Sequence, residues 1–159
     1  DWLDVPELLS AAPGTFLFPM VDRDPIDEWT RGRITLLGDA AHPMYPIGSN
    51  GASQAILDAR VLAGCLRDRG LTEAALHTYE NIRRPATQAI VLANRGLGPE
   101  LPMRLVHERA PSGFTDIDAV ISRAEIESVT EGYRRTAGFA LEALAGGSSL
   151  TETDYSDAP

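Results

Sequence analysis

The sequence has a single cysteine, Cys65, among its 159 residues. No disulfide can form within the chain, and metal sites built on several cysteines are excluded. Basic residues are scarce too, because 14 Lys and Arg stand against 23 Asp and Glu, for a formal net charge of −9. Nucleic acids and anionic membranes bind clustered basic residues, so we predict neither as a partner. No apolar run approaches the roughly 18 residues of a membrane span, and a lone cysteine is compatible with the cytoplasmic location that we expect.

The chain also has no initiator Met and no leading strand, since it opens with DWLDVPELL. We therefore expect the C-terminal part of a longer polypeptide, or one chain of a nicked protein. What is present suits a folded domain, because 43% of the residues are apolar and the length is that of one domain.

Apolar periodicity and capping residues predict mostly helices. Gly70 suits the end of one long helix, Thr72 can cap the next, and Ser122 with Glu125 forms a capping box. The first long helix has an apolar stripe made of Ala52, Ala55, Ile56, Ala59, Leu62, Ala63 and Leu66. The expected elements are a helix at 2–12, strands at 15–21 and 33–38, helices at 52–70, 72–97, 104–108 and 122–139, and a disordered tail at 146–159.

The stretch between the second strand and the first long helix reads GDAAHPMYPIGSNGA. Asp39 follows a strand that we expect to be apolar on both faces, and ligands collect at the carboxyl ends of such strands in open α/β sheets. A buried acid needs hydrogen-bond donors. The hydroxyls of a ribose or a ribityl chain are suitable donors, so Asp39 is a candidate binding residue.

The loop before the helix is rich in Gly and Pro. Gly48 and Gly51 have no Cβ, so a flat ligand can lie against the backbone there, and Asn50 or Ser49 is placed to cap the helix. The first amides of a helix form a partly positive pole that attracts a phosphate or the anionic pyrimidine edge of a reduced flavin. The alternative is a tight connection without a ligand. No Lys follows the glycines, which disfavours a P-loop.

The whole stretch GRITLLGDAAHPMYPIGSNGASQAILDA resembles the second flavin-binding motif of the FAD-dependent aromatic hydroxylases, the p-hydroxybenzoate hydroxylase-like family. The segments FPMVDRDPIDEW and YENIRRP are similar to its phenazine hydroxylase-like branch. The resemblance implies an α/β fold of which this chain is the C-terminal portion, mostly helical with a few strands. The family's G-x-G-x-x-G motif is absent from the sequence, so we expect the N-terminal part of the same enzyme as a partner.

The resemblance also implies a division of the chain. Residues 1–31 correspond to the end of the substrate-domain sheet and a connection, and residues 32–97 to the C-terminal part of the FAD-binding domain. A C-terminal helical extension at 98–145 and the tail at 146–159 complete the chain.

Site residues follow from the same resemblance. Asp39 corresponds to the acid that holds the ribityl and pyrophosphate region of FAD, and Pro46 to the proline beside the flavin ring, near the reaction. The residues facing the N1–C2 edge of the isoalloxazine are Gly48, Ser49, Asn50, Gly51 and Ala52. We place Phe18, Met20 and Tyr45 in the aromatic substrate pocket.

The implied function is that of an oxidoreductase, a flavoprotein monooxygenase that uses FAD, NAD(P)H and O2 to hydroxylate a small planar aromatic compound. No metal is expected. Two alternatives stay open: a flavoprotein with other oxidation chemistry, and a non-catalytic helical interaction module derived from such an enzyme.

The remaining chemically active side chains have structural interpretations. We expect a hydrogen bond for His42, a core position for Cys65, packing for Trp2 and Trp29, and ion pairs of Arg83 and Arg84 with Glu80 or Asp58.

Overall fold

Residues 3–138 are described by a computed structural model of the chain. Five helices account for most of the structure: α1 Val5–Ala11, α2 Gly51–Arg69, α3 Glu73–Arg95, α4 Leu101–Arg109 and α5 Arg123–Thr136. Two short strands, β1 Thr30–Arg31 and β2 Ile34–Thr35, and three 3-10 turns, η1 Gly38–Ala40, η2 Ile47–Ser49 and η3 Gly98–Glu100, complete the described elements. The predictions for Trp2, Phe139 and the tail at 146–159 lie outside the described residues.

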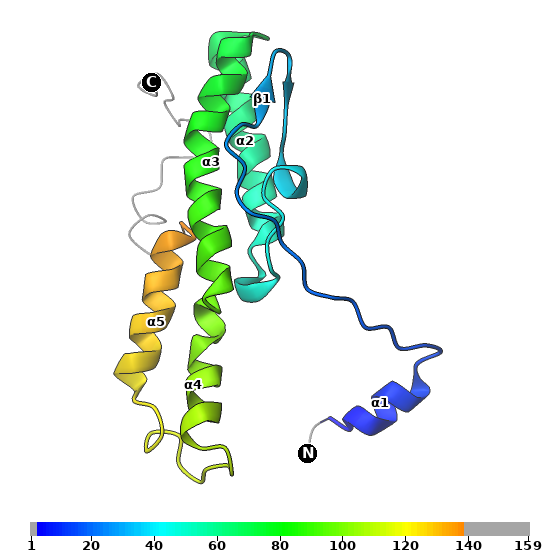
Figure 1. Cartoon of the computed structure of the whole chain (residues 1–159), viewed down its shortest axis with the longest axis vertical. Helices are drawn as coiled ribbons and strands as arrows, with labels where there is room; N and C mark the ends of the chain where they lie inside the picture. Colours follow the sequence, from blue (N-terminus) through cyan, green and yellow to red (C-terminus); the bar gives the residue numbers. More distant parts are fainter. Residues whose placement is uncertain (1–2, 139–159) are drawn as a thin grey trace.

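The two long helices α2 and α3 form the body of the molecule and lie side by side (Figure 1). Gly70 ends α2 with a φ of +71°, where glycine is favoured. Thr72 then caps α3, because its hydroxyl oxygen accepts a hydrogen bond from the Ala75 amide at 3.2 Å. Both predicted helices are confirmed, with ends within about two residues of those expected.

The apolar stripe predicted for α2 is only partly confirmed, because Leu62 and Leu66 pack against the core and Ile56 does not. Ile56 is 70% exposed, whereas the buried face of the first turns carries Gln54 and Asp58. Two polar side chains can replace apolar ones at a buried face only when partners satisfy them. Those partners, described below, come from segments distant in the sequence.

The core lies between α2, α3 and the hairpin formed by β1 and β2. Trp29 is buried with its ring centroid 5.9 Å from that of Tyr79 and 5.6 Å from that of His42. Cys65 is fully buried, and burial raises the pKa of its thiol. The structural roles predicted for Trp29 and Cys65 are confirmed.

The strand predicted at 33–38 is shorter and more open than expected. Only β2, Ile34–Thr35, forms, pairing antiparallel with β1, and Ile34 is 73% exposed. A strand is covered on both faces only in a sheet flanked by other elements. Within residues 3–138, β2 has β1 as its one neighbour.

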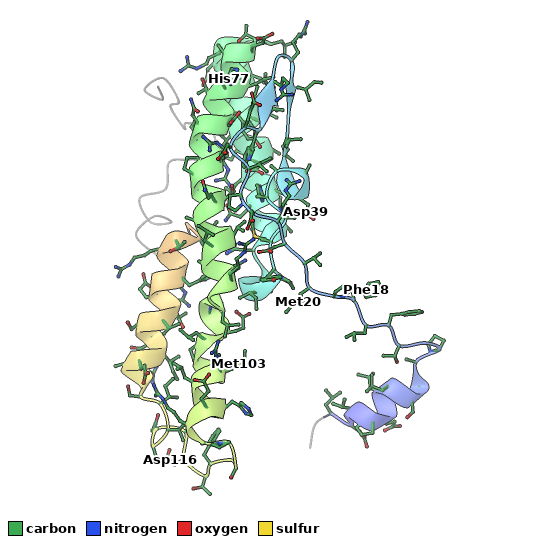
Figure 2. All side chains as sticks on the ribbon, viewed as in Figure 1. Phe18, Met20, Asp39, His77, Met103 and Asp116 are labelled. Carbon is green, nitrogen blue, oxygen red and sulfur yellow. The ribbon has the colours of Figure 1, made fainter. Side chains whose placement is uncertain are left out.

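The strand predicted at 15–21 does not form, and the segment runs as exposed, irregular chain. Figure 2 shows Phe18 and Met20 on this segment as it leaves the body toward α1. Their side chains are 79% and 58% exposed. A strand requires a neighbouring chain for its backbone hydrogen bonds, and residues 3–138 provide none for this segment.

Of the C-terminal helices, α4 continues beyond the end of α3, and α5 packs beside both of them (Figure 1). α4 begins at Leu101 rather than at 104, and Pro102 lies in its first turn, where proline is tolerated. The Ser122 hydroxyl caps α5 by accepting the Glu125 amide at 3.2 Å, as predicted. Arg109 of α4 forms an ion pair with Glu125 at 2.6 Å, which joins the two helices.

Candidate functional site

Asp39 lies on η1, which is packed against the beginning of α2. Gly38 makes the close approach possible, because a Cβ on it would lie 3.3 Å from the Cβ of Ala55, and its φ is +58°. The Gly38 amide donates a hydrogen bond to the Asp58 carboxylate at 3.0 Å. Asp39 itself is exposed, and its carboxylate has no hydrogen bond or ion pair within the described residues. Its acceptor oxygens are therefore available to a ligand.

Asp58 organises the back of this site, where sequence reasoning assigned it only an ion pair. It is fully buried and accepts hydrogen bonds from His42 Nε2 at 2.5 Å and from Arg83 Nε at 2.7 Å, besides the Gly38 amide. Burial alone raises the pKa of this carboxyl, but the hydrogen bonds from His42, Arg83 and Gly38 outweigh it, so the pKa is lowered. The structural hydrogen bond predicted for His42 is confirmed.

The predicted arginine ion pairs are also confirmed. Arg83 binds Asp58 and also donates to Gln54 Oε1 at 2.7 Å, and Arg84 pairs with Glu80 at 3.3 Å. The Gln54 amide group in turn donates to the carbonyl of Ala137 at 3.1 Å. These hydrogen bonds therefore connect η1, α2 and α3 with the C-terminal end of α5. The side chains that form them are Asp58, His42, Arg83 and Gln54.

The loop before α2 has an unusual backbone. Gly48 has a φ of +72° and Ser49 a φ of +51°, and the second value is uncommon for a residue with a side chain. Such strain persists only where the surroundings enforce it, and it is often associated with ligand sites. The Gly48 amide donates to Glu100 Oε1 of η3 at 3.0 Å, which helps to fix the loop.

Gly48 has no room for a side chain because the ring of Tyr133 lies against it, a contact that sequence analysis did not predict. A Cβ there would lie 2.7 Å from both Cε1 and Cζ of Tyr133, a residue of α5. On this side the loop is packed against the protein rather than open to a flat ligand. The assignment of Gly48 to cofactor binding therefore stays a prediction.

Gly51 differs from Gly48, because a side chain at Gly51 would meet little of the protein. A Cβ on Gly51, the first residue of α2, would meet only Met44 Cγ at 3.9 Å. Asn50 stands at the N-cap position but makes no capping hydrogen bond, which corrects the predicted cap. Its amide group donates instead to the Tyr133 hydroxyl at 3.1 Å. Among residues 3–138, no side chain thus caps the first amides of α2, which leaves the positive pole of the helix available to an anion.

Pro46 and Ala52 are both exposed beside this pole. The carbonyl of Pro46 accepts the Ser49 amide at 3.1 Å, and a carbonyl oxygen has a second lone pair for another donor. The residues predicted to line the substrate pocket do not come together here. Phe18 and Met20 project from the exposed segment, while Tyr45 lies in the loop, where its carbonyl accepts the Asn94 side-chain amide at 3.1 Å.

The arrangement fits an FAD molecule in two respects. An unpaired carboxylate at Asp39 suits the hydroxyls of a ribityl chain, and the uncapped start of α2 suits the electron-rich pyrimidine edge of the ring. Both belong to elements that pack against each other, η1 and α2. The described residues contain no group of His, Cys, Asp and Glu that could hold a metal ion. No helix among them is long and apolar enough to cross a membrane.

Comparisons with known proteins agree with this fit. Residues 19–94, which include Asp39, η2 and most of α3, match a family model described as an FAD binding domain. The phenazine 1,6-dicarboxylic acid hydroxylase of Lysobacter antibioticus is 51% identical over 133 residues, covering 84% of this chain and 30% of that relative.

Two further relatives bear monooxygenase names. A 3-amino-4-hydroxybenzoate 2-monooxygenase of Streptomyces platensis is 46% identical over 98 residues, covering 61% of this chain and 25% of the relative. The 6-hydroxynicotinate 3-monooxygenase of Bordetella bronchiseptica is 44% identical over 81 residues, covering 50% of this chain and 21% of the relative. The chain spans less than a third of the length of each of these three proteins.

Proposed function

Because the chain belongs to the p-hydroxybenzoate hydroxylase-like family of FAD-dependent monooxygenases, we propose that it is the C-terminal part of an enzyme that hydroxylates a planar aromatic compound. The family match confirms the predicted FAD-binding fold class, and the described residues are mostly helical with a few strands, as predicted. The observation that carries the proposal is the unpaired Asp39 carboxylate held beside the uncapped start of α2.

FAD, once reduced by NAD(P)H, supplies the activation of O2 from which one oxygen atom enters the aromatic ring. The chain contributes binding and orientation. Asp39 accepts hydrogen bonds from the ribityl hydroxyls, and the backbone amides of Gly51 and Ala52 face the N1–C2 edge of the ring. A helix pole contributes about 0.3–1 kcal/mol to a nearby anion, and up to about 2 kcal/mol when partly buried. It therefore favours the reduced, anionic flavin.

Three further residues complete the proposed cofactor contacts. Gly48, Ser49 and Asn50 form the loop that brings these amides into place. The backbone of Ser49, with a φ of +51°, persists only because its surroundings hold the loop in this conformation. Pro46 lies beside the ring, with one lone pair of its carbonyl still available. We assign the substrate pocket to Tyr45, Phe18 and Met20, which requires the segment around Phe18 to settle against the rest of the enzyme.

The proposed partner is the N-terminal part of the same enzyme, which carries the G-x-G-x-x-G motif. A run of exposed apolar side chains on the segment between α1 and β1 supports this proposal: Phe16, Leu17, Phe18, Met20 and Val21 are each more than half exposed. Contiguous apolar surface of this kind usually marks an interface. From the family resemblance we also propose the division of the chain at 1–31, 32–97 and 98–145. The cytoplasmic location stays a prediction.

The test is to produce the chain together with the N-terminal part and to purify the complex. We expect a yellow protein with stoichiometric FAD, whose consumption of NAD(P)H and O2 rises when a planar aromatic acid is added. A complex without flavin absorbance would refute cofactor binding and favour the non-catalytic interaction module. Bound flavin without O2 uptake would favour other oxidation chemistry.

A further inference from the structure

The ring of Tyr133 lies between two glycines. A Cβ on Gly48 would lie 2.7 Å from Cε1 and Cζ of the ring, and a Cβ on Gly98 would lie 2.8 Å from Cε2. Both glycines have positive φ, +72° and +44°. Neither position has room for a side chain while Tyr133 is in place, so α5 is inserted into the corner formed by η2 and η3.

The Tyr133 hydroxyl forms hydrogen bonds with two asparagine side chains. It donates to Asn94 Oδ1 at 2.7 Å and accepts from Asn50 Nδ2 at 3.1 Å. Because a hydroxyl has one proton, donation to Asn94 leaves it only an acceptor toward Asn50. This fixes which way the Asn50 amide points, with Nδ2 toward Tyr133.

The same set of bonds reaches both ends of the loop. Asn94 donates through Nδ2 to the carbonyl of Tyr45 at 3.1 Å, while Asn50 stands directly before α2. Asn50 and Asn94 are both buried, so neither can replace a lost partner with bulk water. Burial raises the pKa of Tyr133 above its ordinary value of 10.0, so the hydroxyl, which is protonated at neutral pH in any case, keeps its proton to still higher pH.

We propose that Tyr133 is a positioning residue for the cofactor: from the C-terminal helix, it fixes the loop 45–50 and so directs the first amides of α2 at the flavin ring. This inference rests on the proposed function of the chain. Tyr133 does not touch the reacting atoms. It acts through the Asn50 side chain and the backbone of Gly48.

The test variant is Tyr133→Phe in the complete enzyme, which keeps the ring between the two glycines and removes only the hydroxyl. We expect FAD to bind about tenfold more weakly, the equivalent of one buried hydrogen bond. The midpoint potential of the bound flavin should fall, because the helix pole is aimed less well at the reduced ring. In the apo-enzyme, hydrogen exchange should accelerate at the amides of residues 45–52.

Tyr79→Phe is the matched control. The Tyr79 hydroxyl donates to the Leu36 carbonyl at 3.1 Å, so this change also removes one phenolic hydroxyl that forms hydrogen bonds, but in the core. It should reduce stability without altering the flavin potential or the exchange of residues 45–52. A second variant, Asn94→Ala, breaks the same set of bonds without changing Tyr133 and should reproduce the Tyr133→Phe shift.

The possible outcomes separate the two proposals. If the wild-type enzyme binds no FAD, the proposed function and the role of Tyr133 both fall. If the wild-type enzyme binds FAD and Tyr133→Phe leaves affinity, potential and loop exchange unchanged, only the role of Tyr133 is overturned. Equal shifts in Tyr133→Phe and Tyr79→Phe would also overturn it, because they would reflect general destabilisation.

Discussion

The buried carboxylate of Asp58 accepts a hydrogen bond at 3.0 Å from the backbone amide of Gly38, the residue directly before Asp39. The side chain of Asp58 on α2 thereby fixes the beginning of η1, the 3-10 turn that carries Asp39. The same carboxylate binds His42 and Arg83, so one side chain connects three segments that lie far apart in the sequence.

Asp58→Asn should destabilise the protein by about 3 kcal/mol, because it leaves the buried Arg83 guanidinium without its counter-charge. Urea denaturation of wild type and variant measures this difference. The matched control is Asp68→Asn on the same helix, where the acid pairs with Arg67 at the surface. A surface pair contributes at most about 1 kcal/mol, so equal effects of the two changes would contradict the central role of Asp58.

The contribution of Asp58 to the free energy of unfolding should decrease toward acid pH. Its pKa in the folded protein lies below the ordinary value of 3.8, so its ionised form stabilises the fold. That stability is fully present above pH 3.8 and is lost as the pH falls through the lower folded pKa. The difference in unfolding free energy between wild type and Asp58→Asn should therefore hold above pH 3.8 and shrink as the pH falls below it. A difference that grows toward acid would be inconsistent with the lowered pKa.

Asp39→Ala should weaken FAD binding about ten- to a hundredfold, since it removes hydrogen bonds to a charged acceptor. Because Asp39 is exposed and unpaired within the described residues, thermal stability of the apo-protein should stay the same. Fluorescence titration with FAD in the complete enzyme measures the affinity. Asp118→Ala, an exposed acid in the loop before α5, serves as the control. Unchanged affinity in Asp39→Ala would refute its role.

Gly51→Val should abolish seating of the flavin ring while leaving the fold intact. The added side chain meets little protein, because the nearest atom to its Cβ is Met44 Cγ at 3.9 Å. It would instead occupy the space in front of the first amides of α2. Circular dichroism should match that of wild type, and the visible flavin spectrum should be lost. A normal spectrum with normal turnover would count against a ring at this position.

Gly48→Ala and Tyr133→Ala should not be additive. The single change at Gly48 places a methyl group against the Tyr133 ring and also strains a residue at a φ of +72°. Removing the ring relieves the first effect but not the second. We expect the double variant to be more stable than the sum of the single losses predicts, with a coupling of about 1–2 kcal/mol. Additive losses would show that the ring and the glycine are not in contact.

Local sequence patterns predicted the helices well. Thr72, Gly70 and Ser122 mark helix ends through contacts within three residues of themselves, and the structure has helices that begin or end at each of them. The position of Asp39 next to the start of α2 was also predictable, because a strand, a turn and a helix follow one another in the chain.

The buried face of α2 was not predictable from its own residues. Gln54 and Asp58 are polar, and a polar residue is ordinarily assigned to solvent. Their burial depends on Arg83, 25 residues beyond Asp58, and on His42, 16 residues before it. The segment at 15–21 has the composition of a strand, but strand formation depends on a partner chain. The hydroxyl contacts of Tyr133 were not predictable either, because its partner Asn50 lies 83 residues earlier in the sequence.

The insertion of Tyr133 between Gly48 and Gly98 imposes an order of events during synthesis. The ribosome adds about 5–20 residues per second, and 83 residues separate Asn50 from Tyr133, so the loop leaves the ribosome several seconds before the ring that locks it. During that interval the nascent loop samples other backbone conformations, since nothing yet fills the space beside its glycines. We therefore predict that the proposed cofactor loads late in biogenesis, after α5 has left the ribosome.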